Sequence, residues 1–178
     1  MDVELGMQEV SCIFPLFVSL CTLLTAWKRG DWGNFDKYYP TLLYFAVGNL
    51  TYEYIAHMNF HLWQFNGTGI FPEQAIDLIY IILIVIPALF VYLSRYPEVP
   101  KDGIIHVIKW ILIFTIIEWI GGKFFNVIHY HNGWSIWWSL IFNFIMFPMM
   151  RLHYLYYKRA LLLSVPITLG LLIWFNYI

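Results

Sequence analysis

The chain alternates long apolar segments with short polar ones. The apolar segments cover residues 10–27, 41–60, 75–94, 104–125, 135–151 and 160–177. Each approaches the roughly 20 residues that cross a bilayer as an α-helix. None shows the strict alternation of a membrane-spanning β-strand. The pattern therefore predicts an all-α polytopic membrane protein with six transmembrane helices.

The connections between these segments are short, which makes consecutive helices antiparallel neighbours in one bundle. We expect residues 1–178 to form a single integral membrane domain. Pro15, Pro87, Pro148 and Pro166 fall inside predicted helices. A proline in a membrane helix is tolerated when a neighbouring helix satisfies the carbonyl that it leaves without a donor.

The composition supports lipid as the solvent of this chain. Hydrophobic residues make up 61% of the sequence and charged residues only 12%, whereas soluble domains carry about 25% charged residues. The net charge of −1 gives no indication of a nucleic-acid partner. We therefore expect membrane lipid to be the main partner.

The distribution of basic residues predicts the orientation. Of the 10 lysines and arginines, all except Lys123 fall near the first, third and fifth connections. Because basic residues accumulate on the cytoplasmic side, these connections should face the cytoplasm and both termini should lie outside.

Tryptophans and basic residues are also concentrated where the predicted helices meet the membrane surface, as is typical of interfacial anchors. The segment 28–39 is one such anchor, and it could alternatively recognise anionic lipid or a cytoplasmic partner. The expected anchors are Lys28, Arg29, Trp32, Lys37, Trp134, Trp137, Trp138 and Arg151.

Several polar residues fall within the predicted membrane core. Counted from Thr41 along a helix, Glu53 lies about 18 Å into the membrane. The same count places Glu118 and Asn143 in the same outer layer and Asp77 nearer the outer surface. Because a carboxylate facing lipid is costly, these side chains should face a shared pocket.

The stretch EYIAHMNFH adds imidazoles to this layer. Asn49, Glu53, His57 and His61 recur every four residues and would form one polar stripe on a helix. His57 is the expected partner of Glu53, and His61 falls at the membrane boundary. We expect the pocket to bind a cation, a proton or a small polar ligand through Glu53, His57, Asp77, Glu118 and Asn143.

Other interpretations of this layer stay open. Glu53 and Glu118 could simply hydrogen-bond Asn143, Ser139 or tyrosine hydroxyls and hold helices together. In that case the chain could be an assembly protein without a ligand.

A membrane-embedded metal-dependent enzyme is a further alternative, with a divalent metal on His57 and His61. Further ligands would come from the outer connections: His129, His131, Glu73 or Asp77. The sequence contains no P-loop, H-E-x-x-H or G-x-S-x-G motif. We therefore favour a non-enzymatic role without a cofactor, in transport, sensing or an envelope complex with a protein partner.

Several longer motifs carry a resemblance to a known family. They are KRGDWGNFDKYYPTLLYF (28–45), LWQF (62–65), IEW (117–119), YHNGWSIWWS (130–139) and MMRLH (149–153). With these motifs the chain resembles the small, uncharacterised multi-span membrane proteins of Gram-positive endospore formers. The resemblance implies a six-span, multi-pass protein of the bacterial cytoplasmic membrane, and it implies no activity.

Overall fold

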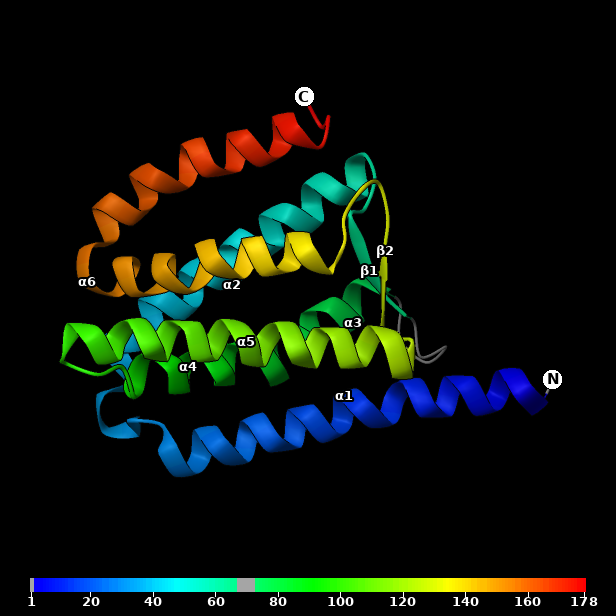
Figure 1. Cartoon of the computed structure of the whole chain (residues 1–178), viewed down its shortest axis with the longest axis horizontal. Helices are drawn as coiled ribbons and strands as arrows, with labels where there is room; N and C mark the ends of the chain where they lie inside the picture. Colours follow the sequence, from blue (N-terminus) through cyan, green and yellow to red (C-terminus); the bar gives the residue numbers. More distant parts are fainter. Residues whose placement is uncertain (1, 67–72) are drawn as a thin grey trace.

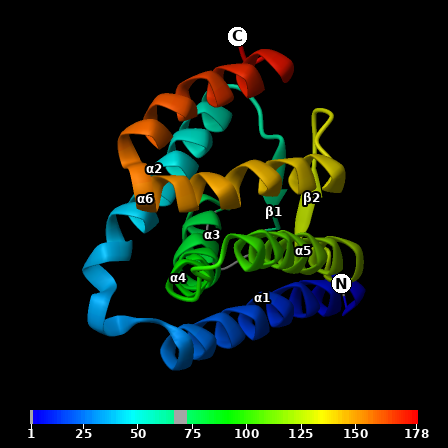
Figure 2. The same ribbon diagram turned by 60° about the vertical axis from the view of Figure 1, so that its left-hand side comes forward.

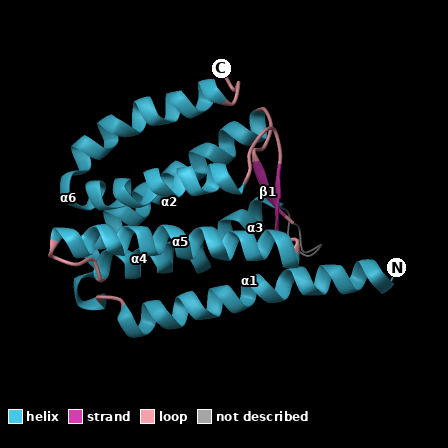
Figure 3. Ribbon diagram, in the orientation of Figure 1, coloured by secondary structure: helices cyan, strands magenta, loops and turns pink. Residues whose placement is uncertain are grey.

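The computed structural model describes residues 2–66 and 73–178. Helices account for 82% of the chain, which confirms the all-α prediction (Figure 3). The helical elements are α1 (Asp2–Arg29), η1 (Trp32–Asn34), α2 (Phe35–Met58), α3 (Glu73–Tyr80), η2 (Ile81–Val85), α4 (Ile86–Ser94), α5 (Pro100–Phe125) and α6 (Ile136–Trp174).

Successive helices run in alternating directions (Figure 1). The connection between α1 and α2, the connection between α4 and α5, and the bend within α6 lie at one end of the molecule. The start of α1, the end of α6 and two short strands lie at the other. This arrangement follows the antiparallel order that the short connections predict.

The two strands were not predicted. β1 (Trp63–Phe65) pairs antiparallel with β2 (Ile128–Tyr130), so the connection after α2 is joined to the connection after α5. A turn with positive φ at Asn132 and Gly133 follows β2 and leads the chain into α6. Three-residue strands are too short to leave a periodic signal in the sequence.

The last two predicted helices, 135–151 and 160–177, are joined in α6. Only Tyr156 has non-helical backbone angles, φ −144° and ψ 65°, and there the chain turns back (Figure 1). Side chains of α2 hold both halves of α6. Thr41 Oγ1 lies 2.9 Å from Nδ1 of His153 before the bend, and the Tyr44 hydroxyl lies 2.5 Å from Ser164 Oγ after it.

α3, η2 and α4 form one continuous helix with a π-helical turn at Ile81–Val85. Pro87 explains the irregularity, because it has no N–H to donate to the carbonyl of Leu83 four residues earlier. That carbonyl instead accepts a hydrogen bond of 2.9 Å from Thr22 Oγ1 on α1. A neighbouring helix thus satisfies the carbonyl, as expected for a proline inside a membrane helix.

The core is centred on α4. All residues from Pro87 to Leu93 are buried, and α4 lies between α1, α2, α5 and α6 (Figure 2). Tyr92 is fully buried and donates its hydroxyl to the carbonyl of Phe147 at 2.9 Å. α4 is therefore the central helix, around which the other helices pack.

The outer surfaces of the helices are apolar. Leu16 is 67% exposed, Leu162 74% and Trp137 71%. Three described helical segments are long and apolar enough to cross a membrane: Ile76–Ser94, Pro100–Phe125 and Ile136–Trp174. The structure is therefore compatible with a membrane location.

Candidate ligand-binding cavity

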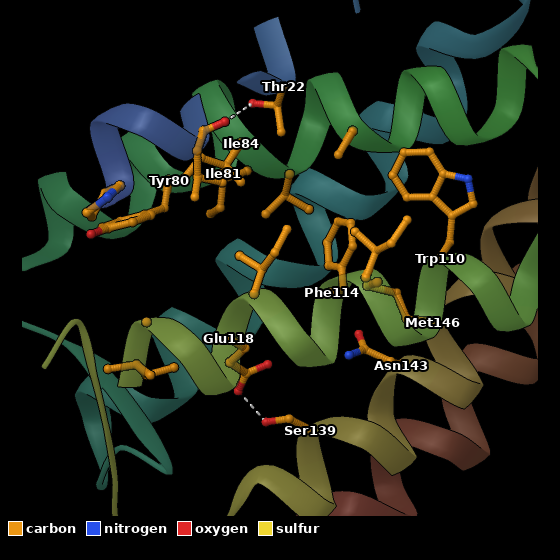
Figure 4. Close-up of a pocket in the computed structure, with 18 of the residues that line it drawn as sticks. Thr22, Tyr80, Ile81, Ile84, Trp110, Phe114, Glu118, Ser139, Asn143 and Met146 are labelled. Carbon is orange, nitrogen blue, oxygen red and sulfur yellow. Dashed lines mark hydrogen bonds between the residues drawn. The ribbon is translucent and has the colours of Figure 1, made fainter. Parts of the chain in front are cut away.

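A cavity of about 800 Å³ lies between α1, the α3–α4 segment, α5 and the first half of α6 (Figure 4). Its volume falls within the range of about 300–1,000 Å³ typical of small-molecule sites. Side chains of α2 and both strands also contribute to its wall. Figure 4 labels Thr22, Tyr80, Ile81, Ile84, Trp110, Phe114, Glu118, Ser139, Asn143 and Met146.

The cavity is elongated along the helices. On the α3–α4 segment its lining extends from Asp77 to Arg95, which is roughly 25 Å of helix. On α5 the lining residues follow helical spacing and include Lys109, Ile113 and Ile117. A single face of each helix therefore lines the cavity along most of its length.

The middle of the cavity is apolar, and its two ends carry opposite charges. Ile81, Ile84, Phe114 and Met146 lie between the ends (Figure 4). The acidic end is lined by Asn49, Glu53, Asp77, Glu118, Ser139 and Asn143, and the basic end by Arg29, Arg95, His106 and Lys109.

Glu118 is held by a hydrogen-bond network. Its Oε1 accepts hydrogen bonds from the Tyr130 hydroxyl at 2.7 Å and from Ser139 Oγ at 2.5 Å. Trp134 Nε1 donates to Ser139 Oγ at 3.0 Å. Burial, assisted by the charge of Glu118, raises the pKa of Tyr130, so its phenol stays a donor. The network orients the carboxylate and ties β2 to α6.

Glu53 and Asp77 form the second polar group at this end. The carboxyl groups of Glu53, on α2, and Asp77, on α3, lie close to each other. His61 Nε2 lies 3.9 Å from Glu53 Oε2. Nearby, Asn143 is 5% exposed and donates to Thr115 Oγ1 at 3.2 Å.

Four of the predicted ligand-binding residues thus line one cavity: Glu53, Asp77, Glu118 and Asn143. The fifth, His57, is exposed on α2 and is not part of the lining. The imidazole near Glu53 is that of His61, because α2 ends at Met58 and the chain then turns back. A continuous helix, as assumed from the sequence, would carry His61 away from Glu53.

The residues considered for a metal are His57, His61, His129, His131, Glu73 and Asp77. Within residues whose side chains are described, no group of three or more His, Cys, Asp or Glu side chains is placed to hold a metal ion. The rings of His129 and His131 lie 6.5 Å apart. The side chain of Glu73 lies outside the described part of the chain.

The residues expected to anchor the chain at the membrane surface occupy different environments. Trp32 and Trp137 are 53% and 71% exposed, whereas Trp134 is buried against Leu62 and Phe175. Trp138 packs beside Trp134, and Lys28 and Lys37 are exposed. The Arg151 guanidinium stacks on the ring of Tyr96 at 4.1 Å.

Sequence reasoning missed the basic end. Arg29 was interpreted as part of a surface segment that anchors the chain or recognises anionic lipid, and Arg95 and Lys109 as markers of orientation. The spacing of Lys109, Ile113 and Ile117 could have indicated this end, because it places the lysine on the same face of α5 as the two apolar residues that line the cavity.

Comparisons with protein-family models, with curated proteins and with solved structures returned no match to this chain.

Proposed function

We propose that the chain is an integral membrane protein whose cavity binds a cation, a proton or a small polar ligand at its acidic end. In this proposal it crosses the bacterial cytoplasmic membrane six times, with both termini outside. The alternating helices and the apolar outer surfaces support the crossings. The basic residues Arg29 and Arg95 lie by the connections at the end opposite the strands, which supports the orientation.

The observation that carries the proposed binding is the meeting of carboxyl groups from three elements at one end of a largely apolar cavity. Glu53 comes from α2, Asp77 from α3 and Glu118 from α5. Carboxyl groups within a membrane are costly and occur mainly on ion, proton and substrate pathways. Lys123, the one basic residue that the sequence places away from the first, third and fifth connections, lies over the rings of Trp119 and Phe124.

The two groups of carboxyls have different roles in this proposal. Glu118 is oriented by Tyr130 and Ser139 and offers a carboxyl group in a fixed position. In this proposal Glu53 and Asp77, which lie close to each other, share a proton that the arrival of a cation would release. The acidic end would then exchange protons for cations, which suits transport or sensing.

A purely structural role is the second candidate, and the bonds of Glu118 favour it. Both donors to its Oε1 come from other elements, as expected of a residue that joins helices. In that case neutral variants would keep every property of the protein except its charge.

Cation binding by the purified protein in neutral detergent separates these candidates. We expect Na⁺ or tetramethylammonium to raise the melting temperature and to release protons into a weakly buffered solution. Glu53→Gln should abolish proton release and weaken binding about tenfold or more, whereas Glu98→Gln, an exposed change outside the cavity, should alter neither. Unchanged responses in Glu53→Gln and Glu118→Gln would contradict the proposal and leave the structural role.

A further inference from the structure

The basic end of the cavity is assembled from separate helices. Arg29 is the last residue of α1, Arg95 caps the end of α4, and Lys109 lies one turn beyond His106 on α5. All of them line the cavity that contains the carboxyls at its far end. The cations are therefore brought together by the packing of the helices.

A hydrogen bond to the backbone positions the Arg95 side chain beside the end of α1. Arg95 Nε donates a hydrogen bond of 2.7 Å to the carbonyl oxygen of Arg29. The close approach of α1 to α4 depends on Gly30, because a Cβ there would lie 2.3 Å from a ring carbon of Phe90. The bond uses one edge of the Arg95 guanidinium and leaves its terminal nitrogens available to an anion.

No carboxylate neutralises this group within the described part of the chain. The single ion pair found there joins His61 and Glu53, at the other end of the cavity. The nearest acidic residue in the sequence is Asp31, whose oxygens accept hydrogen bonds from Asn34 and from the Tyr38 hydroxyl. The basic end thus presents unpaired positive charge to whatever occupies the cavity.

An apolar wall begins directly beside these cations. On α5 it continues from Trp110 through Ile113 to Ile117, and on the facing α4 from Val91 through Ala88. From Lys109 to Glu118 the wall covers about 14 Å of helix. A site for a small inorganic anion would not require this wall, whereas an alkyl chain attached to an anionic group would fill it.

We propose that the cavity binds a single-chain amphiphile, with its carboxylate or phosphate head at Arg29, Arg95 and Lys109 and its alkyl chain along the apolar wall. The inference uses the same cavity as the proposed function but rests on the opposite end. Charge complementarity selects an anionic head, and the apolar wall selects a long chain over a free anion. Lipids of the surrounding bilayer are the natural source of such a molecule.

Binding of matched probes to the full-length protein, measured by native mass spectrometry from neutral detergent, tests this inference. The probes are oleate, oleoyl lysophosphatidate, oleyl alcohol and inorganic phosphate. We expect oleate and lysophosphatidate to bind at one molecule per protein and at least about tenfold more tightly than the alcohol. The preferred acid identifies the head group. Inorganic phosphate should displace neither oleate nor lysophosphatidate.

Variants locate the head group. Arg29→Gln combined with Arg95→Gln should weaken oleate binding at least about tenfold and leave the alcohol unaffected. Lys101→Gln is the matched control, because Lys101 is an exposed residue of α5 that does not line the cavity. A chain with bromine at its centre should quench the fluorescence of wild-type protein more than that of Trp110→Phe, and this measurement does not need the arginine variants to fold.

Several outcomes would overturn the inference. They are equal binding of oleate and oleyl alcohol, full displacement by inorganic phosphate, and unchanged oleate affinity in the folded double arginine variant. The result is separable from that for the acidic end. Glu53→Gln should leave oleate binding intact, and the arginine variant should leave proton release intact, so either proposal can fail alone.

Discussion

The two ends of the cavity are built in different ways. At the acidic end Glu118 accepts hydrogen bonds from Tyr130 and Ser139, and Glu53 lies close to Asp77. At the basic end Arg29, Arg95 and Lys109 are exposed, and Arg95 donates a hydrogen bond to a backbone carbonyl. The acidic end is therefore part of the folded framework, whereas the basic end is a surface that the fold positions. Substitutions at the two ends should differ accordingly in their cost to stability.

The largest effect is expected at Glu118. Glu118→Leu removes the acceptor shared by Tyr130 and Ser139 and leaves donors unpaired in the protein interior, which should cost about 2–4 kcal/mol. Glu118→Gln keeps an acceptor oxygen and should cost about 1 kcal/mol. Thermal unfolding in detergent, followed by circular dichroism, measures both. Equal stability of the two variants would mean that the network does not hold β2 to α6.

The next largest effect on stability is expected at the π-helical turn, between the two ends of the cavity. Thr22→Val removes the hydroxyl that bonds the Leu83 carbonyl and should cost about 1–2 kcal/mol. The same hydroxyl lies near the carbonyls of Val18 and Ser19, but those belong to its own helix and do not face a proline.

Two further variants test this explanation by thermal unfolding. Pro87→Ala supplies the missing N–H, so the double variant with Thr22→Val should regain most of the loss. Thr25→Val is the control, since the Thr25 hydroxyl bonds the Cys21 carbonyl of its own helix, and it should cost less than about 0.5 kcal/mol. If the double variant is no more stable than Thr22→Val alone, Pro87 does not explain the turn.

A smaller effect is expected at the basic end. Arg95→Gln removes a charge from an exposed side chain and should change the free energy of unfolding by less than about 1 kcal/mol. The same change should weaken binding of an anionic amphiphile. A loss of stability as large as that of Glu118→Leu would remove the distinction between the two ends.

More of the acidic end than of the basic end could be predicted from the sequence, for a physical reason. Helical rise is constant, so counting residues placed Glu53, Glu118 and Asn143 at one depth, and they line one cavity. The count assumed that the helix continued to His61, whereas α2 ends at Met58. Which face of a helix is covered depends on contacts distant in the sequence, so Lys109 could not be assigned to a cavity.

The fold likewise has features that the sequence predicts and features that it does not. Apolar length predicted the helices and the break between residues 151 and 160, within which the chain bends at Tyr156, but the pairing of β1 with β2 depends on tertiary contacts. No glycine or proline marks position 156. The bonds from Thr41 to His153 and from Tyr44 to Ser164 hold the two halves of α6 against α2. Such contacts between α2 and α6 leave no local pattern.

The smallest effect on stability is expected at Asp31, the acidic residue closest in sequence to Arg29 of the basic end. The hydrogen bond from Asn34, opposed by burial and assisted by the Tyr38 hydroxyl, holds the pKa of Asp31 below its ordinary value of 3.8. A depressed pKa stabilises the fold above pH 3.8, and this contribution is lost as the pH falls through the lower, folded-state value. Asn34→Ala should raise the pKa of Asp31 toward 3.8 and reduce this dependence slightly. Melting temperatures between pH 5 and pH 3, compared with those of Asp31→Asn, measure it, and an unaltered profile in Asn34→Ala would assign the shift to Tyr38 and Lys37 instead.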